Sequence, residues 1–527
     1  MTIAHGPAEA ARHPYQWWEY RWAVLAFVLV SALPLLWPDV PPLVDLPGHM
    51  GRYRVQLDLA TSAELQRFFT FEWAIIGNLG VDLIVHALGP VFGIEPVVKG
   101  VVVAIPALTA AGLLWVAREV HGRVPPTALF ALPFAFNYPF LFGFINFALS
   151  MALALLAFAL WLRLGRQERY GLRIALMLPI SCILWICHTF GWGTLCVMAF
   201  SAELVRRFDQ NGNLFIAGWR TGLHCLALAP PFALMLLWRS NAGGETFDWF
   251  NWEAKFAWLQ MALRDRWAWF DQLSLILVIA VLVWVLISKK VTFSRNLGAS
   301  ALFMLVVYLV LPRVVFGSAY ADMRMAPYIF AVALIAIRVP EGHLKLSRAL
   351  AAAAFAFFAV RTMASGVSLY LYDANYDRQL AALDHIPKGA AVVSFVGRPC
   401  VEPWGMSRLH HLPAMATVRN SAFSNDQWTT AGAQLLEVNY SVGGRFVRDP
   451  SQIVTGGRDR CVGEYWLTIE QSLARFPRGA FDYVWLIDPP AHDAALTRGL
   501  AEVWRDGTSV LYRVERAAGT PSPAPQP

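Results

Sequence analysis

An acid, a base and a cation stand close together in the segment Asp45-Leu-Pro-Gly-His49-Met-Gly-Arg52. Spacings of three and four residues put His49, Arg52 and Gln56 on one face of a helix that begins near Pro47. A carboxylate and an imidazole can exchange a proton with a substrate, and a guanidinium can hold a phosphate through paired hydrogen bonds. In a structural alternative, Asp45 caps the helix and Arg52 contacts lipid phosphate.

A second polar group lies in the segment from Pro312 to Arg324, between two apolar runs. Arg313 and Arg324 are suited to binding phosphate, and Asp322 could hold Arg324 in a fixed orientation. The structural alternative is a pair of arginines that anchor helix ends among lipid headgroups.

The histidines give weaker signals. His188 ends an apolar run at a tight turn, where it either faces a cavity or is satisfied by a backbone carbonyl. His410 and His411 are adjacent, and neighbours on a chain rarely point at one metal ion. The sequence therefore predicts no cofactor and no metal site, although dependence on a divalent metal stays open. It has no Walker loop and no dinucleotide fingerprint, so a nucleotide-driven machine is not expected.

The composition of the chain indicates the environment in which these residues act. Of 527 residues, 57% are hydrophobic and 15% are charged, so most of the chain is expected inside a lipid bilayer. The net charge of +7 is spread over short clusters of Lys and Arg between apolar runs. Such clusters mark cytoplasmic loops rather than one basic binding surface, and no nucleic-acid partner is expected.

The basic clusters indicate which loops lie in the cytoplasm, and so how the chain passes through the membrane. Residues 1–21, which include Arg12, stay in the cytoplasm, and residues 22–369 form an α-helical transmembrane region of about eleven spans. Residues 38–73 are the first external loop, and residues 74–92 form a helix that dips into the membrane from outside. Because an odd number of spans follows a cytoplasmic N-terminus, the rest of the chain lies outside the cytoplasm.

Composition changes after Tyr370, where hydrophobic runs shrink to strand length and Asp, Arg, Gly and Pro become frequent. β-branched runs and helical spacings predict that residues 370–516 form an extracytoplasmic α/β domain. The predicted strands are Ala390–Val396, Phe481–Ile487 and Ser509–Val514, and one predicted helix is Thr468–Phe476. Residues 517–527 are rich in Pro and Ala and are expected to be a disordered tail.

Cys400 and Cys461 are the two cysteines of this domain. In an oxidising compartment they either form a disulfide or stay apart, and sequence alone does not decide between the two. The other four cysteines lie inside predicted spans.

Several short motifs follow one another along the chain. They are Asp45-Leu-Pro-Gly-His49 with Arg52, Gly143-Phe-Ile-Asn-Phe147 at the start of a span rich in Leu and Ala, Cys187-His188, and His410-His411-Leu-Pro-Ala414. Together they are similar to a group of uncharacterised bacterial multi-pass membrane proteins. The retained first helix, the long external loop that opens with an acidic residue, the many spans and the C-terminal external domain resemble the GT-C class of integral-membrane glycosyltransferases.

The resemblance implies a reaction and a location. In the GT-C class, an acidic residue of the first external loop activates the acceptor hydroxyl, and basic residues hold the phosphate of a polyprenyl-linked sugar donor. By position, Asp45 would be the catalytic base with His49 beside it. The implied substrate-binding residues are Arg52, Arg313, Asp322, Arg324 and His188. The implied partners are membrane lipid, a polyprenyl-phosphate sugar donor and a cell-envelope glycan or lipid acceptor, at a bacterial inner membrane.

Two other functions stay open. The helical core could be a non-catalytic scaffold or a lipid-binding protein, in which case the polar residues should lie scattered and individually solvated. A transporter is less favoured, because no symmetric pair of broken helices is predicted near the membrane midplane. An enzyme instead predicts that Asp45, His49, Arg52, Arg313 and Arg324 converge on one external cavity.

Overall fold

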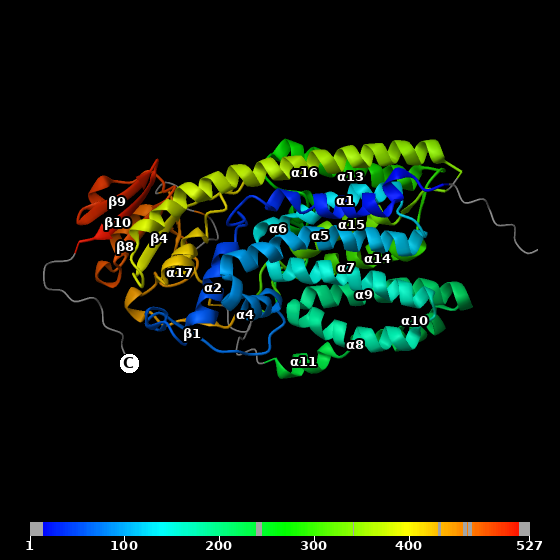
Figure 1. Cartoon of the computed structure of the whole chain (residues 1–527), viewed down its shortest axis with the longest axis horizontal. Coiled ribbons are helices and arrows are strands. Elements are labelled where there is room, and N and C mark those ends of the chain that lie inside the picture. The colour runs from blue at the N-terminus through cyan, green and yellow to red at the C-terminus, as the bar shows by residue number, and fades with distance from the viewer. Residues whose placement is uncertain are drawn as a thin grey trace, which may run out of the picture.

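The computed structural model describes residues 14–238, 245–340, 342–429, 434–456, 461 and 466–515. Two predictions fall outside these residues: the cytoplasmic placement of the first residues around Arg12, and the disordered tail 517–527. Within the described part, the chain is mostly helical and forms a sheet near its C-terminus (Figure 1).

Long apolar runs form the helices of a bundle, because a helix pairs its backbone N–H and C=O groups within one segment and so tolerates an apolar environment. The longer helices are α1 (Arg21–Val30), α2 (Leu46–Asp58), α4 (Gly80–Phe92), α5 (Ile94–His121), α7 (Ile145–Arg166), α8 (Tyr170–Cys187), α9 (Thr189–Asn211), α10 (Leu214–Cys225), α13 (Ala268–Ile287), α14 (Arg295–Val310), α15 (Ala321–Ile335) and α16 (Leu344–Leu380). The shorter helices are α3 (Ala63–Gln66), α6 (Tyr138–Phe142), α11 (Pro231–Leu237), α12 (Trp252–Gln260), α17 (Met415–Asn420) and α18 (Ile469–Arg475).

Five helices of the described residues are long and apolar enough to cross a membrane: α5, α7, α8, α13 and α16. A sixth span would be the pair that includes α10 and α11, which is bent by 54° at a short break. Shorter apolar helices, including α1, α4 and α14, accompany them. These features are compatible with the predicted membrane protein, and the number of eleven spans stays a prediction.

Three predicted membrane segments take a different form. The first apolar run forms only α1 and a short 3-10 turn, Leu33–Leu35, because a proline interrupts it. The run from Val124 to Phe142 forms a buried 3-10 helix, Pro126–Phe136, followed by α6. The segment 74–92, predicted to dip into the membrane, becomes helical only from Gly80, as α4.

The C-terminal region contains a mixed sheet of six strands in the order β7-β6-β4-β8-β10-β9. Its strands are β4 (Val392–Gly397), β6 (Ile453–Thr455), β7 (Leu467–Thr468), β8 (Tyr483–Ile487), β9 (Leu500–Asp506) and β10 (Ser509–Val514). Strand β4 pairs in parallel with β6 and β8, and β10 pairs antiparallel with β8 and β9. The three predicted strands correspond to β4, β8 and β10, and the predicted helix corresponds to α18.

The external loop and the C-terminal region form one structural unit at one end of the bundle (Figure 1). Strand β1 (Phe69–Phe71) of the loop pairs antiparallel with β5 (Leu436–Val438). Phe68 and Phe69 pack in the same hydrophobic core as residues of β4 and β8. The predicted boundary at residue 370 falls inside α16, which continues from the bundle into the C-terminal region as one helix.

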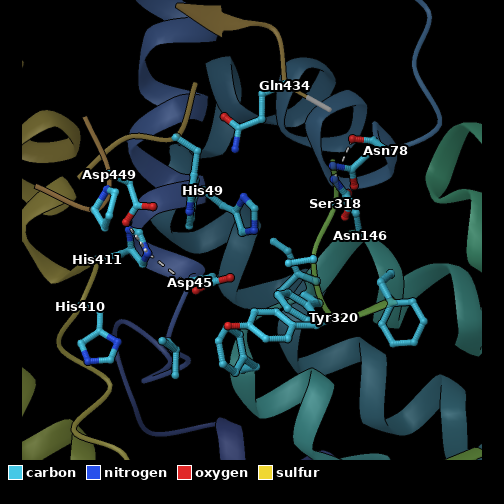
Figure 2. A pocket seen from close by; sticks show the side chains of 18 of the residues that line it. Asp45, His49, Asn78, Asn146, Ser318, Tyr320, His410, His411, Gln434 and Asp449 are labelled. Carbon is cyan, nitrogen blue, oxygen red and sulfur yellow. Dashed lines mark hydrogen bonds and ion pairs between the residues drawn. The ribbon is translucent and has the colours of Figure 1, made fainter. Parts of the chain in front are cut away.

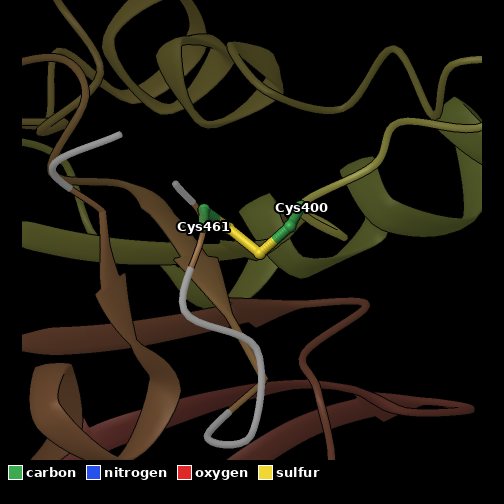
Figure 3. The surroundings of a disulfide bond; sticks show 2 residues. All are labelled: Cys400 and Cys461. Carbon is green, nitrogen blue, oxygen red and sulfur yellow. A yellow bond between two sulfur atoms is a disulfide. The ribbon is translucent and has the colours of Figure 1, made fainter. Parts of the chain in front are cut away.

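Cys400 and Cys461 form a disulfide bond (Figure 3), with their Cα atoms 5.0 Å apart. The alternative in which these two cysteines stay apart is therefore wrong. The bond ties the loop after β4 to the segment after β6, across a sequence separation of 61 residues.

Candidate functional site

A cavity of about 430 Å³ lies where the helical bundle meets the C-terminal region (Figure 2). Polar residues line it from both sides. The bundle and its external loop contribute Asp45, His49, Asn146, His188, Tyr320 and Arg324. The C-terminal region contributes Arg398, His410, His411, Gln434 and Asp449.

Asp45 stands at the point where the external loop turns into α2. Its backbone N–H donates to the carbonyl oxygen of Phe142 at 2.9 Å. Gly143 permits this close approach, because a Cβ atom there would lie 2.7 Å from the Asp45 nitrogen and its φ of +101° suits glycine. The Asp45 side chain makes no capping hydrogen bond to α2. The capping alternative is therefore wrong, and the carboxylate lines the cavity instead.

His411 connects the C-terminal region to Asp45. Its Nε2 lies 3.9 Å from a carboxylate oxygen of Asp45 and 3.8 Å from one of Asp449 (Figure 2). Its Nδ1 lies 3.0 Å from the carbonyl oxygen of Asp426. Because a carbonyl oxygen only accepts, Nδ1 carries the proton, and a neutral imidazole turns the lone pair of Nε2 toward both carboxylates. The Trp428 ring packs against His411, with ring centroids 4.2 Å apart.

Burial and charge bring the proton affinities of Asp45 and His411 closer together. Burial raises the pKa of Asp45 well above its usual range; the charge of Asp449 adds to this rise, and the charge of Arg324 opposes it. Burial lowers the pKa of His411, while Asp449 and the carbonyl of Asp426 oppose this fall. An acid and a base whose pKa values approach each other in this way can share one proton.

Arg324 brings a positive charge to the cavity from the first turns of α15. One of its terminal nitrogens donates to the carbonyl oxygen of Ala319 at 2.8 Å. Its guanidinium lies over the ring of Phe144, 4.3 Å from the centroid. Among the described residues, the Nε of Arg324 has no hydrogen-bond partner. The guanidinium is thus held in place beside the cavity, and its Nε is not used by the described protein.

His49 and His188 also line the cavity. Nδ1 of His49 is buried and has no hydrogen-bond partner in the part of the chain that the structure describes. Nδ1 of His188 accepts the backbone N–H of Phe190 at 3.1 Å, at the start of α9. Nδ1 of His49 is therefore not held by the described protein, whereas His188 has one nitrogen occupied by the protein.

Arg52, a predicted phosphate-binding residue, does not line the cavity. It is 2% exposed, and its guanidinium lies 2.8 Å from the carboxylate of Asp82. Asn146 donates to the same carboxylate at 2.9 Å, and Gln56 donates to the Asp82 carbonyl at 2.9 Å. Arg52 therefore ties α2 to α4 through its ion pair with Asp82, although its Nε has no hydrogen-bond partner among the described residues.

Arg313 and Asp322 also lie outside the cavity lining. Arg313 is partly exposed and lies 3.6 Å from a carboxylate oxygen of Asp248. Asp322 is fully buried and lies 3.4 Å from the ammonium of Lys255. No hydrogen bond or ion pair between Asp322 and Arg324 is found among the described residues, because residues two apart on a helix do not face each other, so the Asp322 charge acts on Arg324 only from a distance.

No pattern in the sequence assigns a role to Asp449, Trp428 or Gln434. His411 belongs to the motif that carries the resemblance, and its adjacency to His410 speaks only against a metal site. No spacing along the chain relates Asp449 to Asp45, because the two meet only through the docking of the C-terminal region onto α2.

Among the described residues, no group of three or more His, Cys, Asp and Glu side chains is arranged to hold a metal ion. No known family model matches this chain, and no curated protein matches it. The chemistry of the cavity is therefore the main guide to function.

Proposed function

We propose that this protein is a membrane glycosyltransferase, which transfers a sugar from a polyprenyl-phosphate-linked donor to an acceptor at the extracytoplasmic face. The observation that carries the proposal is that Asp45 and Arg324 line one cavity. Transfer from a sugar phosphate requires a base for the acceptor hydroxyl and a cation for the departing phosphate. The resemblance of the chain to the GT-C class supports the same reaction.

In the proposed reaction, the oxygen of an acceptor hydroxyl forms a bond to the anomeric carbon of the donor sugar. The bond from that carbon to the phosphate oxygen breaks, and the phosphate keeps the electron pair. Asp45 takes the hydroxyl proton. Arg324 stabilises the negative charge that develops on the departing polyprenyl phosphate.

Asp45 must be ionised to act as a base, whereas burial favours its protonated form. In our proposal, Nε2 of His411 accepts the proton of Asp45 after a small rotation closes the distance of 3.9 Å. The carboxylate of Asp449 and the face of Trp428 then stabilise the imidazolium. Asp45 is left ionised and ready for the proton of the acceptor.

A non-catalytic scaffold or lipid-binding protein is less favoured. Such a protein would leave the polar groups scattered and individually solvated. Asp45 and Arg324 are instead both buried around one cavity, although α2 and α15 are far apart in the sequence. Buried charged groups that face a shared cavity are typical of functional sites.

The proposal includes the topology expected from the charge pattern. The N-terminus lies in the cytoplasm of a bacterial cell, about eleven spans cross the inner membrane, and residues 370–516 lie outside. The disulfide between Cys400 and Cys461 supports an oxidising, extracytoplasmic location for this region. The cavity would then open near the outer surface of this membrane, where a lipid-linked donor presents its sugar.

The test uses the full chain in lipid nanodiscs, with polyprenyl-phosphate-linked hexoses and pentoses as donors and a cell-envelope extract as acceptor. Release of free polyprenyl phosphate reports transfer. We expect Asp45→Asn to abolish release. Asp39→Asn is the matched control, because the Asp39 side chain is 90% exposed and lies outside the cavity lining. Retained activity in a folded Asp45→Asn protein would refute the assignment of the base, and no release from any donor by the unmodified protein would refute the donor class.

A further inference from the structure

A second concentration of charge involves Arg173, Glu203, Arg206 and Arg207. These residues belong to α8 and α9, which run to the end of the bundle away from the C-terminal region (Figure 1). Helices α8 and α9 meet at His188 beside the cavity, so their other ends lie far from it. Arg173 near the start of α8 and Glu203, Arg206 and Arg207 on the last turns of α9 gather there. We call these four residues the arginine cluster. The proposed sugar transfer uses none of them.

Glu203 is the carboxylate that the three arginines share. Its oxygens lie 3.1 Å from Arg173, 2.8 Å from Arg207 and 4.0 Å from Arg206. Three guanidinium charges therefore face one carboxylate charge, and two positive charges of the cluster stay uncompensated. Such like charges repel one another unless an anion joins them.

His224 of α10 does not supply the missing acceptors. Its Nδ1 lies 2.9 Å from Arg173, and its Nε2 lies 2.8 Å from Arg207. A guanidinium only donates, and a neutral imidazole has a single accepting nitrogen, so one of these contacts sets two N–H groups against each other. Arg173 is only 1% exposed, so water screens its own charge poorly, whereas Arg206 is partly exposed. A topology signal alone would not require such burial, since exposed arginines serve that purpose equally well.

A cavity of about 330 Å³ adjoins the cluster, and its charged lining residues are the cations Arg166, Arg173 and Arg206 and the carboxylates Glu119 and Glu203. Glu119 pairs with Arg166 at 2.6 Å. Gly165 allows two guanidinium groups to approach one point. A Cβ atom at this position would lie 2.8 Å from an Nη of Arg173 and 3.0 Å from an Nη of Arg206. The Arg173 guanidinium is also fixed over the ring of Trp161, 3.9 Å from the centroid. The cavity is thus a preorganised place for a small anionic group.

We propose that the arginine cluster binds a phosphate group, and that in the membrane this phosphate belongs to the headgroup of an anionic phospholipid. Guanidinium groups match phosphate oxygens through forked, charge-assisted hydrogen bonds. Helices α8 and α10 expose the large apolar side chains Leu172, Leu214 and Phe215 near the same end of the bundle, where acyl chains can lie. Basic pockets between membrane helices are known to hold such headgroups.

The test counts bound lipids on the intact full-length protein by native mass spectrometry, after addition of phosphatidylglycerol, phosphatidylcholine or inorganic phosphate. We expect phosphatidylglycerol to bind about tenfold more tightly than phosphatidylcholine. Arg206→Gln should remove most of this difference. The matched control is Arg295→Gln, because Arg295 lies at the same end of the bundle, pairs with Asp209 and does not line this cavity.

Three outcomes decide the proposal. Equal binding of the two lipids by the unmodified protein, or equal losses in Arg206→Gln and Arg295→Gln, overturns the site. Inorganic phosphate binding as tightly as phosphatidylglycerol overturns the lipid as occupant and supports a site for free phosphate. Arg206 is partly exposed, so its replacement should leave the fold intact. Arg206→Lys keeps the charge without the fork, and we expect an intermediate affinity.

Discussion

Nε2 of His411 lies 3.9 Å from the carboxylate of Asp45, although the two residues are far apart in the sequence. Asp45 belongs to the external loop of the helical bundle and His411 to the C-terminal region, so the two parts of the chain meet at this pair. The carbonyl of Asp426 holds Nδ1, so the nitrogen that faces Asp45 is the one able to accept a proton. The C-terminal region is therefore part of the candidate site rather than a separate appended domain.

His411→Asn tests the proposed proton transfer. An asparagine amide can replace the donor at Nδ1, but it provides nothing at the position of Nε2. We expect kcat to fall about 10²-fold with KM little changed, because the proton of Asp45 loses its acceptor. Steady-state kinetics of polyprenyl phosphate release give both constants. A change confined to KM would instead assign His411 to substrate binding.

Asp449→Asn tests the electrostatic link to Asp45. Activity requires that Asp45 and His411 together hold one proton rather than two, so the rate should rise as pH increases through the pKa at which the pair loses its first proton. The charge of Asp449 raises the pKa of both groups. Without this charge both pKa values fall, and we expect the acid limb of the pH–rate profile to move to lower pH. Asp58→Asn, which removes a carboxylate that pairs with Arg54 outside the cavity, should leave the limb in place.

Arg52 and Arg54 lie on the same helix in different surroundings, and their replacement should affect stability differently. The ion pair of Arg52 with Asp82 is buried, whereas the side chains of Arg54 and Asp58 are 32% and 33% exposed. Arg52→Gln leaves a buried carboxylate without its cation, and we expect a loss of about 3–5 kcal/mol. Arg54→Gln should cost less than about 1 kcal/mol. Thermal unfolding of the full chain in detergent compares the two, and similar small losses would show that α2 does not depend on the buried pair.

Local spacing was sufficient to bring Asp45 and His49 to one cavity, because the relation between residues four apart is set by the helix itself. The same spacing predicted that Arg52 lies with them, and this prediction is wrong. Asp82 of α4 meets that part of α2 and takes the guanidinium. Helical periodicity predicts the direction in which a side chain leaves its helix. It does not predict which residue of another element lies in that direction.

The contribution of the C-terminal region could not be predicted in this way. Its strands were recognisable from their β-branched runs, since strand propensity is carried by a few consecutive residues. The docking of that region depends on long-range contacts such as the pairing of β1 with β5. The positions of His411 and Asp449 beside Asp45 follow from this docking, and no motif within either segment encodes it.

The disulfide should stabilise the wall of the cavity. Cys400 and Cys461 lie near Arg398 and Trp466, and the Arg398 guanidinium is 4.4 Å from the centroid of the Trp466 ring. Closing a loop across a sequence separation of 61 residues lowers the conformational entropy of the unfolded chain, which raises its free energy by about 4 kcal/mol. We expect the double replacement Cys400→Ser/Cys461→Ser to lower the Tm, and a reducing agent to lower the Tm of the unmodified protein only. An equal effect of the reducing agent on both proteins would contradict this role.

Arg324 and Arg313 should differ in their effect on donor binding, although the sequence offers no reason to separate them. Arg324 lines the cavity with Asp45 and keeps an unused donor, whereas Arg313 pairs with Asp248 outside it. A charge-assisted hydrogen bond to phosphate contributes about 1.5–3 kcal/mol, so Arg324→Gln should raise the Kd for a polyprenyl phosphate about tenfold or more. Arg313→Gln should change it less than about twofold, because paired surface charges contribute little. Competition by polyprenyl phosphate against the labelled donor measures both values. Equal losses would mean that the phosphate lies between the two arginines, away from Asp45, and the base would then have to be sought among the residues near Arg313.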